Sequence, residues 1–368
     1  MSAAPRPRTQ TNASGERVRR LARFGTHVEL RVQAGPHHRV QAEQRLDRAS
    51  ALLAEFDRRL SRFDPASELC ALNADPRSSV PASPMMQRFA EAVGWAGRQS
   101  DGLVDASVLA AVERAGYVES IDPSSLDAAG GRPLDAAPAT APFGGLGAAM
   151  HAGAPRGTGR SDDRATGTWR DVRAAGGSVE RPTGLRLDSG GIGKGLAADL
   201  AADLLRGAPS WVVDCGGDLR LGGTAGIPRA VDITDPLDPS RVIHRLHVTR
   251  GGVATSGVTR RSWDLAGERR HHLIDPRTGH PADTGVLQVT ALAPTALEAE
   301  VLAKTALLAG PELAHKRLPH GGVIIAASGL VTIVPPPRLA RTPRRRRVRA
   351  AFHVPGRPTA LHLVDLPR

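Results

Sequence analysis

Strand-like and helical stretches follow one another along this chain without the strict alternation that builds a parallel sheet. Runs that predict strands, by apolar–polar alternation or by β-branched apolar content, cover residues 24–33, 211–213, 241–248, 285–293 and 322–327. Apolar positions at helical spacing cover residues 40–60, 84–99, 194–206 and 296–309. Because strands cluster with helices between some of them only, the sequence predicts an α+β fold.

Positive charge is concentrated at the two ends of the chain. The formal net charge is +12, of which the first 24 residues contribute +5 and the last 31 contribute +8, so the part between them is nearly neutral. Arg-rich ends of this kind are usually solvated and hold any polyanion loosely. Aromatic residues make up only 3% of the chain, so the aromatic interleaving of a nucleic-acid site is missing, and we expect no specific nucleic-acid binding.

Composition also predicts the limits of the folded part. We expect residues 1–20 to form a disordered basic arm, 21–337 to form one domain, and 338–368 to form an Arg-rich tail. Residues 120–165 are rich in Gly, Ala, Pro, Ser and Asp and predict a low-complexity insertion. No apolar run of membrane-spanning length and no secretory h-region is visible, so we expect a cytoplasmic protein without a membrane span.

Four glycines surround one lysine in the stretch LDSGGIGKGLAAD, residues 187–199. It is not a Walker A loop, because Asp188 stands where the first glycine belongs and Gly195 stands where Ser or Thr belongs. It is not a dinucleotide fingerprint either, because Leu196 replaces the third glycine. A glycine turn that opens a helix nevertheless offers backbone N–H groups and a positive dipole end to an anion, and Lys194 adds a full charge. The alternative is a tight turn with a surface lysine.

A second dense stretch, RHHLIDPRTGHP at residues 270–281, places His272 just before Asp-Pro turn chemistry. A histidine titrates near neutrality, so His272 is a candidate general base or acid. The alternative is that His271 and His272 are ordinary strand or surface residues. A third glycine turn, DCGGDL at residues 214–219, is equally consistent with a simple hairpin.

Taken in order, these stretches resemble the FAD:protein FMN transferases, the ApbE-type flavin transferases, from about residue 24 to 335. The matching pieces are FGT at 24–26, SRFDPASEL…N at 61–73, GLVDAS at 102–107, DSGGIGKGLAAD at 188–199, GGD at 216–218, TSG at 255–257 and HHLIDPRTG at 271–279. The resemblance implies one domain of mixed, mainly antiparallel sheets with packed helices. It also implies Mg²⁺-dependent cleavage of FAD and attachment of FMN, through a phosphoester, to a Thr or Ser of an acceptor protein. Some members of the family only hydrolyse or bind FAD.

Site residues follow from the resemblance position by position. His272 would be the base, with Asp275 nearby to orient it. The metal would be held by the backbone near Gly191 and by the helix at 296–309. FAD contacts would fall at Phe24, Phe63, Leu103, Val104, Asp105, Asp188, Lys194 and Leu273.

The metal-binding helix departs from the family pattern. Where the family reads ADALATAL, this chain reads AEVLAKTA, so Glu300 takes the carboxylate position and Lys304 takes a position usually held by Thr. Residues four apart share a helix face, so the Lys304 ammonium would pair with Glu300 and repel Mg²⁺. We therefore expect either a transferase whose Mg²⁺ rests mainly on Glu300, or an FAD-binding protein without transferase activity in which Lys304 replaces the metal. The third alternative is an ordinary ion pair on a solvated helix face.

Overall fold

The computed structural model describes residues 9–12, 14–120, 167–265, 267–337, 349–350 and 362–363. The chain divides into two compact units, residues 1–336 and 337–368. The second contributes only the strand pair β19 (Arg349–Ala350) and β20 (His362–Leu363) to the described residues. The predicted insertion and most of the predicted tail lie outside those residues. Within the described ranges, no helix combines the length and the apolar character needed to cross a bilayer.

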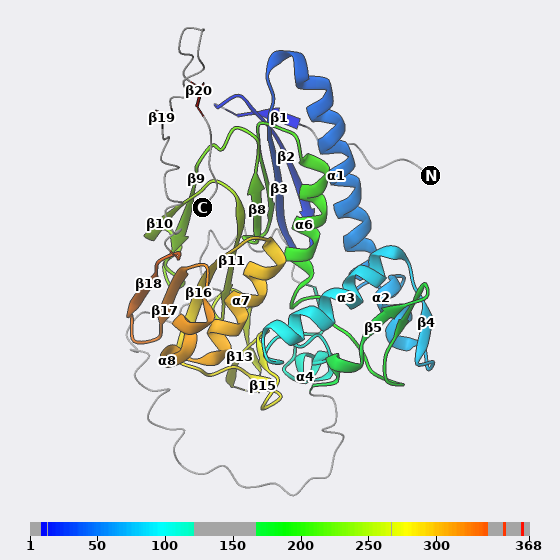
Figure 1. Cartoon of the computed structure of the whole chain (residues 1–368). Helices are drawn as coiled ribbons and strands as arrows, with labels where there is room; N and C mark the ends of the chain where they lie inside the picture. The colour runs from blue at the N-terminus through cyan, green and yellow to red at the C-terminus, as the bar shows by residue number, and fades with distance from the viewer. Residues whose placement is uncertain are drawn as a thin grey trace, which may run out of the picture. The chain divides into compact units, whose positions relative to one another are not determined.

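One large antiparallel sheet organises the first unit (Figure 1). Every neighbouring pair in it runs antiparallel. In spatial order its nine strands are β1 (Thr9–Thr11), β2 (Glu16–Arg23), β3 (Thr26–Gln33), β7 (Ser210–Cys215), β8 (Leu219–Gly222), β11 (Gly251–Gly257), β16 (Val286–Ala293), β17 (Gly322–Ala326) and β18 (Val331–Val334).

Three helices cover one face of this sheet, which confirms the predicted α+β class. They are α1 (Arg39–Leu60), α6 (Gly193–Leu205) and α7 (Ala296–Ala309), and α6 packs against both of the others. The predicted helical stripe of α1 is buried, with Leu46 and Leu53 fully removed from solvent. Because side chains alternate along a strand, Val28, Leu30 and Val32 of β3 point into the same core.

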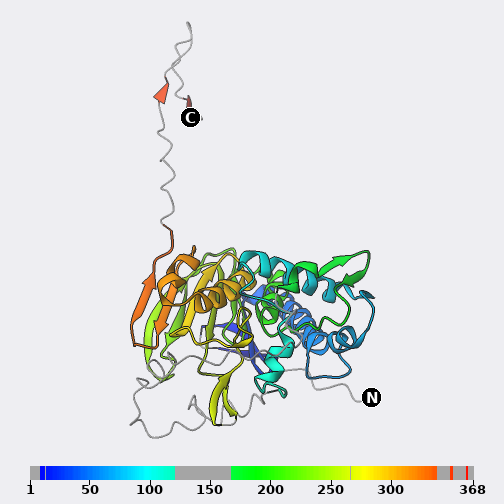
Figure 2. The same ribbon diagram turned by 90° about the horizontal axis from the view of Figure 1, so that it is seen from below.

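A smaller lobe packs against α1, α6 and α7, far from β17 and β18 in both views (Figures 1 and 2). Its elements are α2 (Glu68–Ala74), β4 (Ser79–Pro81), α3 (Pro84–Gln99), α4 (Leu109–Arg114), β5 (Arg173–Ala175) and β6 (Ser178–Glu180). Ser67 caps α2, because its side chain accepts the N–H of Cys70. Short hairpins complete the unit: β9 (Arg229–Thr234) with β10 (Val242–Val248), β12 (Ser262–Leu265) with β13 (Glu268–His271), and β14 (Ile274–Asp275) with β15 (His280–Pro281).

The predicted basic arm is wrong for residues 9–11 and 16–20, because residues 9–11 form β1 and residues 16–20 belong to β2, which pairs with both β1 and β3. Val18 is buried, and Arg19 is only 4% exposed because Glu43 and Asp47 of α1 hold its guanidinium. Arginines that look solvated in a sequence can therefore line a strand when a neighbouring helix supplies carboxylates.

The hairpin β9–β10 lies on the sheet face opposite to the three helices. Val231 and Leu246 pack against Val212 and Leu221, and Ile233 packs against Val323. The apolar contacts of the hairpin are therefore concentrated on the strands from β7 to β17. The groups that β3 projects onto this face, such as Arg31, are left beside an open cavity described below.

Candidate active site

Direct hydrogen bonds tie the separate sequence motifs together. The Asn73 side chain donates to the Leu187 carbonyl at 2.9 Å and accepts its N–H at 2.8 Å. Ser189 donates to the Leu60 carbonyl at 2.7 Å. Asp199, the last residue of the glycine–lysine motif, accepts the N–H groups of Ala296 and Leu297 at the start of α7, each at 2.9 Å. Asp199 therefore caps the N-terminus of α7 rather than serving as a catalytic residue, and it fixes α7 against α6.

Gly195 explains why the loop cannot carry the hydroxyl of a Walker motif. A Cβ at this position would lie 2.7 Å from the Ala296 carbonyl oxygen, so any side chain would push α6 and α7 apart. Its N–H also donates to Glu300 Oε2 at 2.8 Å. Gly195 is therefore required for close helix packing, and that packing brings Glu300 under the lysine loop.

Two lysines and two carboxylates form a buried cluster at the junction of α6 and α7. Lys304 Nζ lies 2.8 Å from Glu300 Oε1, and Lys194 Nζ lies 3.9 Å from the same oxygen. Lys194 also contacts Asp218 of the GGD turn. Glu300 is fully buried, and Lys304 is 8% exposed. Burial lowers the pKa of Lys194 to about 8; Lys304 and Arg261 act in the same direction, while Glu300 opposes them.

The cluster corrects the interpretation of the Glu300–Lys304 pair as a solvated ion pair, because both side chains are buried. It also bears on the metal prediction for Gly191, Glu300 and Lys304. Gly191 lines a cavity, but one Glu300 oxygen already accepts a backbone N–H and the other accepts the Lys304 ammonium. In the described ranges no three His, Cys, Asp or Glu side chains gather as metal ligands. A carboxylate whose two oxygens already accept a backbone N–H and an ammonium, with a second ammonium nearby, is a poor Mg²⁺ ligand, because Mg²⁺ needs several free oxygens.

His272 has the geometry of a neutral base. Its Nδ1 lies 3.4 Å from the Arg261 carbonyl oxygen, which can only accept, so Nδ1 carries the proton and Nε2 keeps a lone pair. Burial, with the positive charges of Arg261 and Lys304, lowers the pKa of His272 well below its usual 6.5. His271 has a structural role instead, because its Nε2 lies 2.9 Å from the Ala282 carbonyl oxygen.

Asp275 does not take the orienting role that we predicted. Its Oδ1 accepts the N–H of Arg277 at 2.9 Å, and its carbonyl oxygen accepts the N–H of Gly279 at 2.8 Å. The carboxylate is also held by the Arg277 guanidinium. Asp275 therefore closes its own turn, and the Arg261 carbonyl orients His272 in its place.

A cavity of about 150 Å³ collects all eight residues predicted to contact FAD. Phe24, Phe63 and Leu273 supply apolar wall, while Asp188 and Lys194 stand at the glycine loop. Burial raises the pKa of Asp188, and the nearby Arg62 guanidinium opposes that shift. The carboxylate of Asp105, another member of this set, is already satisfied by the N–H groups of Ser107 and Gly167. Asp105 therefore stabilises the backbone that forms the cavity wall.

Phe24 occupies a strained backbone position. With Gly25 it forms the two-residue turn between β2 and β3, and both residues have positive φ, 58° and 61°. Such a turn favours Asn-Gly, and a bulky residue there is uncommon. The ring of Phe24 meets Phe56 edge-on, with centroids 5.9 Å apart, and lines the cavity. Strain kept at a cavity wall is a mark of a functional position.

Sequence reasoning missed an aromatic and cationic wall of the same cavity. The Arg62 guanidinium stacks over Phe63 at 4.1 Å and over Tyr117 at 4.6 Å, and it contacts Asp188 at 3.3 Å. Tyr117 in turn stacks on Trp263. Arg62 lies inside the SRFDPASEL motif, so its position near the predicted FAD contact Phe63 could have been inferred from the sequence. Tyr117 and Trp263 lie outside every motif and carried no signal.

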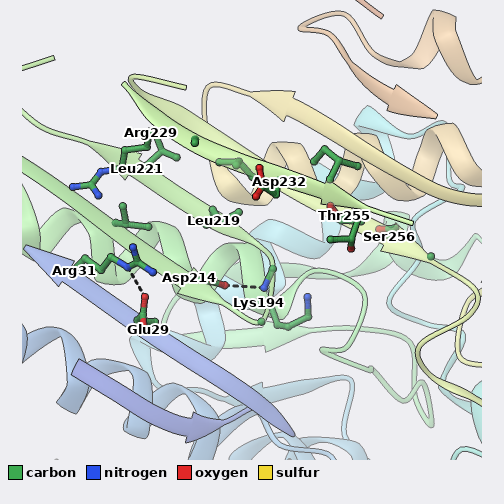
Figure 3. A pocket seen from close by; sticks show the side chains of 18 of the residues that line it. Glu29, Arg31, Lys194, Asp214, Leu219, Leu221, Arg229, Asp232, Thr255 and Ser256 are labelled. Atoms are coloured by element: carbon green, nitrogen blue, oxygen red, sulfur yellow. Dashed lines mark hydrogen bonds and ion pairs between the residues drawn. The ribbon is translucent and has the colours of Figure 1, made fainter. Parts of the chain in front are cut away.

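A second cavity of about 740 Å³ lies between the helix-free face of the sheet and β9 (Figure 3). Figure 3 shows Lys194 at one end and Arg229 toward the other, with Leu219 between them. The two cavities share walls, because Gly190, Lys194, Arg261, His272 and Lys304 line both of them. His272 and Lys194 therefore open onto one common place.

Comparisons with known proteins support the family resemblance that the sequence motifs indicated. The ApbE family profile matches residues 24–324. The FAD:protein FMN transferases of Escherichia coli K12 and Treponema pallidum are each 35% identical, over 146 and 145 residues. These alignments cover 38% and 35% of this chain and only 42% and 39% of the relatives. The chain thus matches less than half the length of these curated relatives.

Solved structures show the same fold at low sequence identity. The ApbE protein of Thermotoga maritima superposes with a TM-score of 0.68 at 22% identity, covering 86% of this chain and 96% of that one. The apo flavinyl transferase ApbE of Pseudomonas stutzeri gives 0.64 at 20% identity, covering 86% and 94%. With the family match spanning most of the chain, the sequence and the fold lead to the same assignment: this protein belongs to the ApbE family.

Proposed function

We propose that this protein is an FAD:protein FMN transferase that attaches FMN to a Thr or Ser hydroxyl of an acceptor protein. The observation that carries the proposal is the shared wall of the two cavities, at which Lys194, Arg261, His272 and Lys304 meet. One cavity has the aromatic lining that a flavin or adenine ring requires. The other gives a second reactant access to the same place.

The charges of the shared wall suit a diphosphate. In the apo protein Lys194 and Lys304 are balanced by Asp218 and Glu300, and Arg261 adds one more positive charge. Bound FAD would bring its diphosphate between the ammonium groups and the start of α6, whose helix dipole favours anions. Positive groups held there stabilise the charge that develops on the bridging oxygen as it leaves.

The transfer step requires one base. The hydroxyl oxygen of the acceptor forms a bond to the phosphorus of the FMN half, and the bond from that phosphorus to the bridging oxygen breaks. The hydroxyl proton passes to Nε2 of His272, which keeps its lone pair because Nδ1 is bound to the Arg261 carbonyl. AMP leaves with the bridging oxygen and its electron pair, next to Lys194 and Lys304.

The Mg²⁺ dependence that the resemblance implies is not part of this proposal. Both oxygens of Glu300 already accept a hydrogen bond, one of them from Lys304, so we assign the electrostatic role of a metal to the Lys304 ammonium. The same observation favours a second candidate function, FAD binding without transfer. In this second candidate, the Lys304 ammonium replaces the metal in holding the FAD diphosphate but does not support the transfer of FMN.

Mass spectrometry of hydroxyl-containing peptides, incubated with FAD and the protein in EDTA, separates these possibilities. Added FMN mass supports the transferase, and FAD binding without added mass supports the second candidate. The matched variant is Lys304→Thr, which exposes Glu300 Oε1 and supplies a hydroxyl. We expect its FAD affinity to fall about tenfold in EDTA and to recover with Mg²⁺, while the wild type ignores both reagents. An FAD affinity of the wild type that collapses in EDTA would contradict the assignment.

A further inference from the structure

Among the residues that the structure describes, the strand β9 is paired along one edge only, and its other edge faces the larger cavity. All six consecutive residues from Arg229 to Thr234 line that cavity. Neighbouring residues of a strand point to opposite faces, so a cavity that touches every one of them runs along an edge rather than over a face. The other edge is taken by β10, and within the described part of the chain these two strands form a sheet of their own. Unpaired strand edges bind further strands.

The remaining walls turn this edge into a slot (Figure 3). Val212, Leu219 and Leu221 lie on its floor, and Glu29 and Arg31 of β3 lie on the wall across from β9. The six residues of β9 span about 20 Å, which is long enough to pair with an extended peptide segment. We name this space the β9 slot.

One end of the β9 slot reaches the reactive centre. The Gln288 side chain donates to the Thr234 carbonyl at 3.1 Å, and Gln288 pairs with Gly257, the last residue of the TSG motif. The C-terminal end of β9 therefore lies beside Thr255 and Ser256, in the cavity that His272 and Lys194 also line. At the far end Arg229 is held by Glu16 and Ser210.

We propose that the β9 slot binds the acceptor protein as an extended segment, added as a further strand on the free edge of β9. The segment delivers its Thr or Ser hydroxyl at the Thr234 end, next to His272. This inference rests on the proposed transferase function and gives it a docking surface. Main-chain hydrogen bonds to β9 supply affinity, and the floor selects side chains, as in other cases of strand addition.

The lining also sets the chemistry of the segment. The charged side chains that β2, β3 and β9 contribute to the slot are paired within the protein, Glu29 with Arg31, Glu16 with Arg229 and Asp232 with Arg245. A charged peptide would have to break such a pair or remain unpaired. With an apolar floor below, the slot fits an uncharged segment whose alternate residues are small and apolar.

A matched pair of substitutions tests the slot. Ala230 is exposed on β9 and lines the slot, whereas His247 is its exposed cross-strand partner on β10, away from it. The acceptor probe is a pool of uncharged peptides of roughly 12 residues, enough to extend past both ends of β9, each with one central Thr. We expect A230W to reduce FMN transfer to the pool at least about tenfold, with H247W transferring like the wild type. Both variants should bind FAD within twofold of the wild type, which shows that they are folded. Equal transfer by A230W and H247W would overturn the slot.

Hydrogen exchange keeps the proposal testable if the wild type transfers FMN to no peptide, a result that would remove the proposed function. Adding the pool should slow amide exchange within β9 of the wild type and not of A230W. Unchanged exchange in β9 would overturn the slot. So would amides on both edges of β9 that are already protected in the protein alone, because another segment of the chain would then occupy the edge.

Discussion

Replacing Lys304 with Met tests whether the Glu300–Lys304 pair is buried as described. The pair is 2.8 Å apart, and Glu300 is fully removed from solvent. A solvated pair of this spacing contributes about 0.3–0.5 kcal/mol to the free energy of unfolding. Removing one partner of a buried pair costs about 3–5 kcal/mol, because the other charge is left without compensation. Glu300 would keep the Gly195 N–H and Lys194 at 3.9 Å, so we expect the lower end, about 3 kcal/mol.

Urea unfolding followed by tryptophan fluorescence measures this loss, since Trp169 and Trp211 are buried. Glu300→Gln combined with Lys304→Met removes both charges and keeps an oxygen for the Gly195 N–H. We expect this double variant to lie within about 1 kcal/mol of the wild type, because a buried ion pair contributes little over a neutral replacement. The control is Arg206→Met, which breaks an exposed pair with Asp203 and should cost under about 0.5 kcal/mol. A loss below about 1 kcal/mol for Lys304→Met would refute the reasoning, because that value fits a solvated pair.

Three further outcomes can be measured on the same preparation. His272→Ala should lower the transfer rate by roughly 10²–10⁴ with FAD affinity unchanged. In the wild type, the lowered pKa of His272 keeps the imidazole neutral at pH 6.5, so the pH–rate profile should show no fall in rate at that pH from protonation of the base. Lys194, with its pKa lowered to about 8, loses its charge as the pH rises, so FAD affinity in a fluorescence titration should weaken above pH 8 and not below it. Gly195→Ala should cost about 1–3 kcal/mol in urea unfolding, because its Cβ meets the Ala296 carbonyl; an unchanged midpoint would mean that α6 and α7 separate freely.

Elements with strong local signals were predictable from the sequence. The periodic stripes of α1 and α3 gave their bounds to within a residue or two, and the glycine–lysine motif opens α6 where expected. The motif set also brought together the residues of the smaller cavity, because the order of its pieces is specific even where each piece is weak. What the motifs could not tell was which members are structural. Asp199 caps a helix and Asp275 closes a turn, and carboxylates in those roles look the same in a sequence as catalytic ones.

The less predictable features depend on tertiary contacts. Lys304 was readable as a partner of Glu300, but α7 carries apolar residues around both, and only its packing between α6 and the sheet removes the pair from water. The β2 strand was hidden for a similar reason, since Arg17 and Arg19 resemble a solvated arm until Glu43 is placed beside them. The edge of β9 has no sequence signature at all, because an unpaired edge is a property of what the neighbouring strands leave uncovered.

The two cavities meeting at one wall have a consequence for the order of events in turnover. In the transferase that we propose, the nucleotide and the hydroxyl donor would enter through different cavities and could both be present when the phosphorus is attacked. This predicts a ternary complex and no flavin bound covalently to the enzyme. Initial rates measured while both concentrations are varied should then give intersecting rather than parallel double-reciprocal lines.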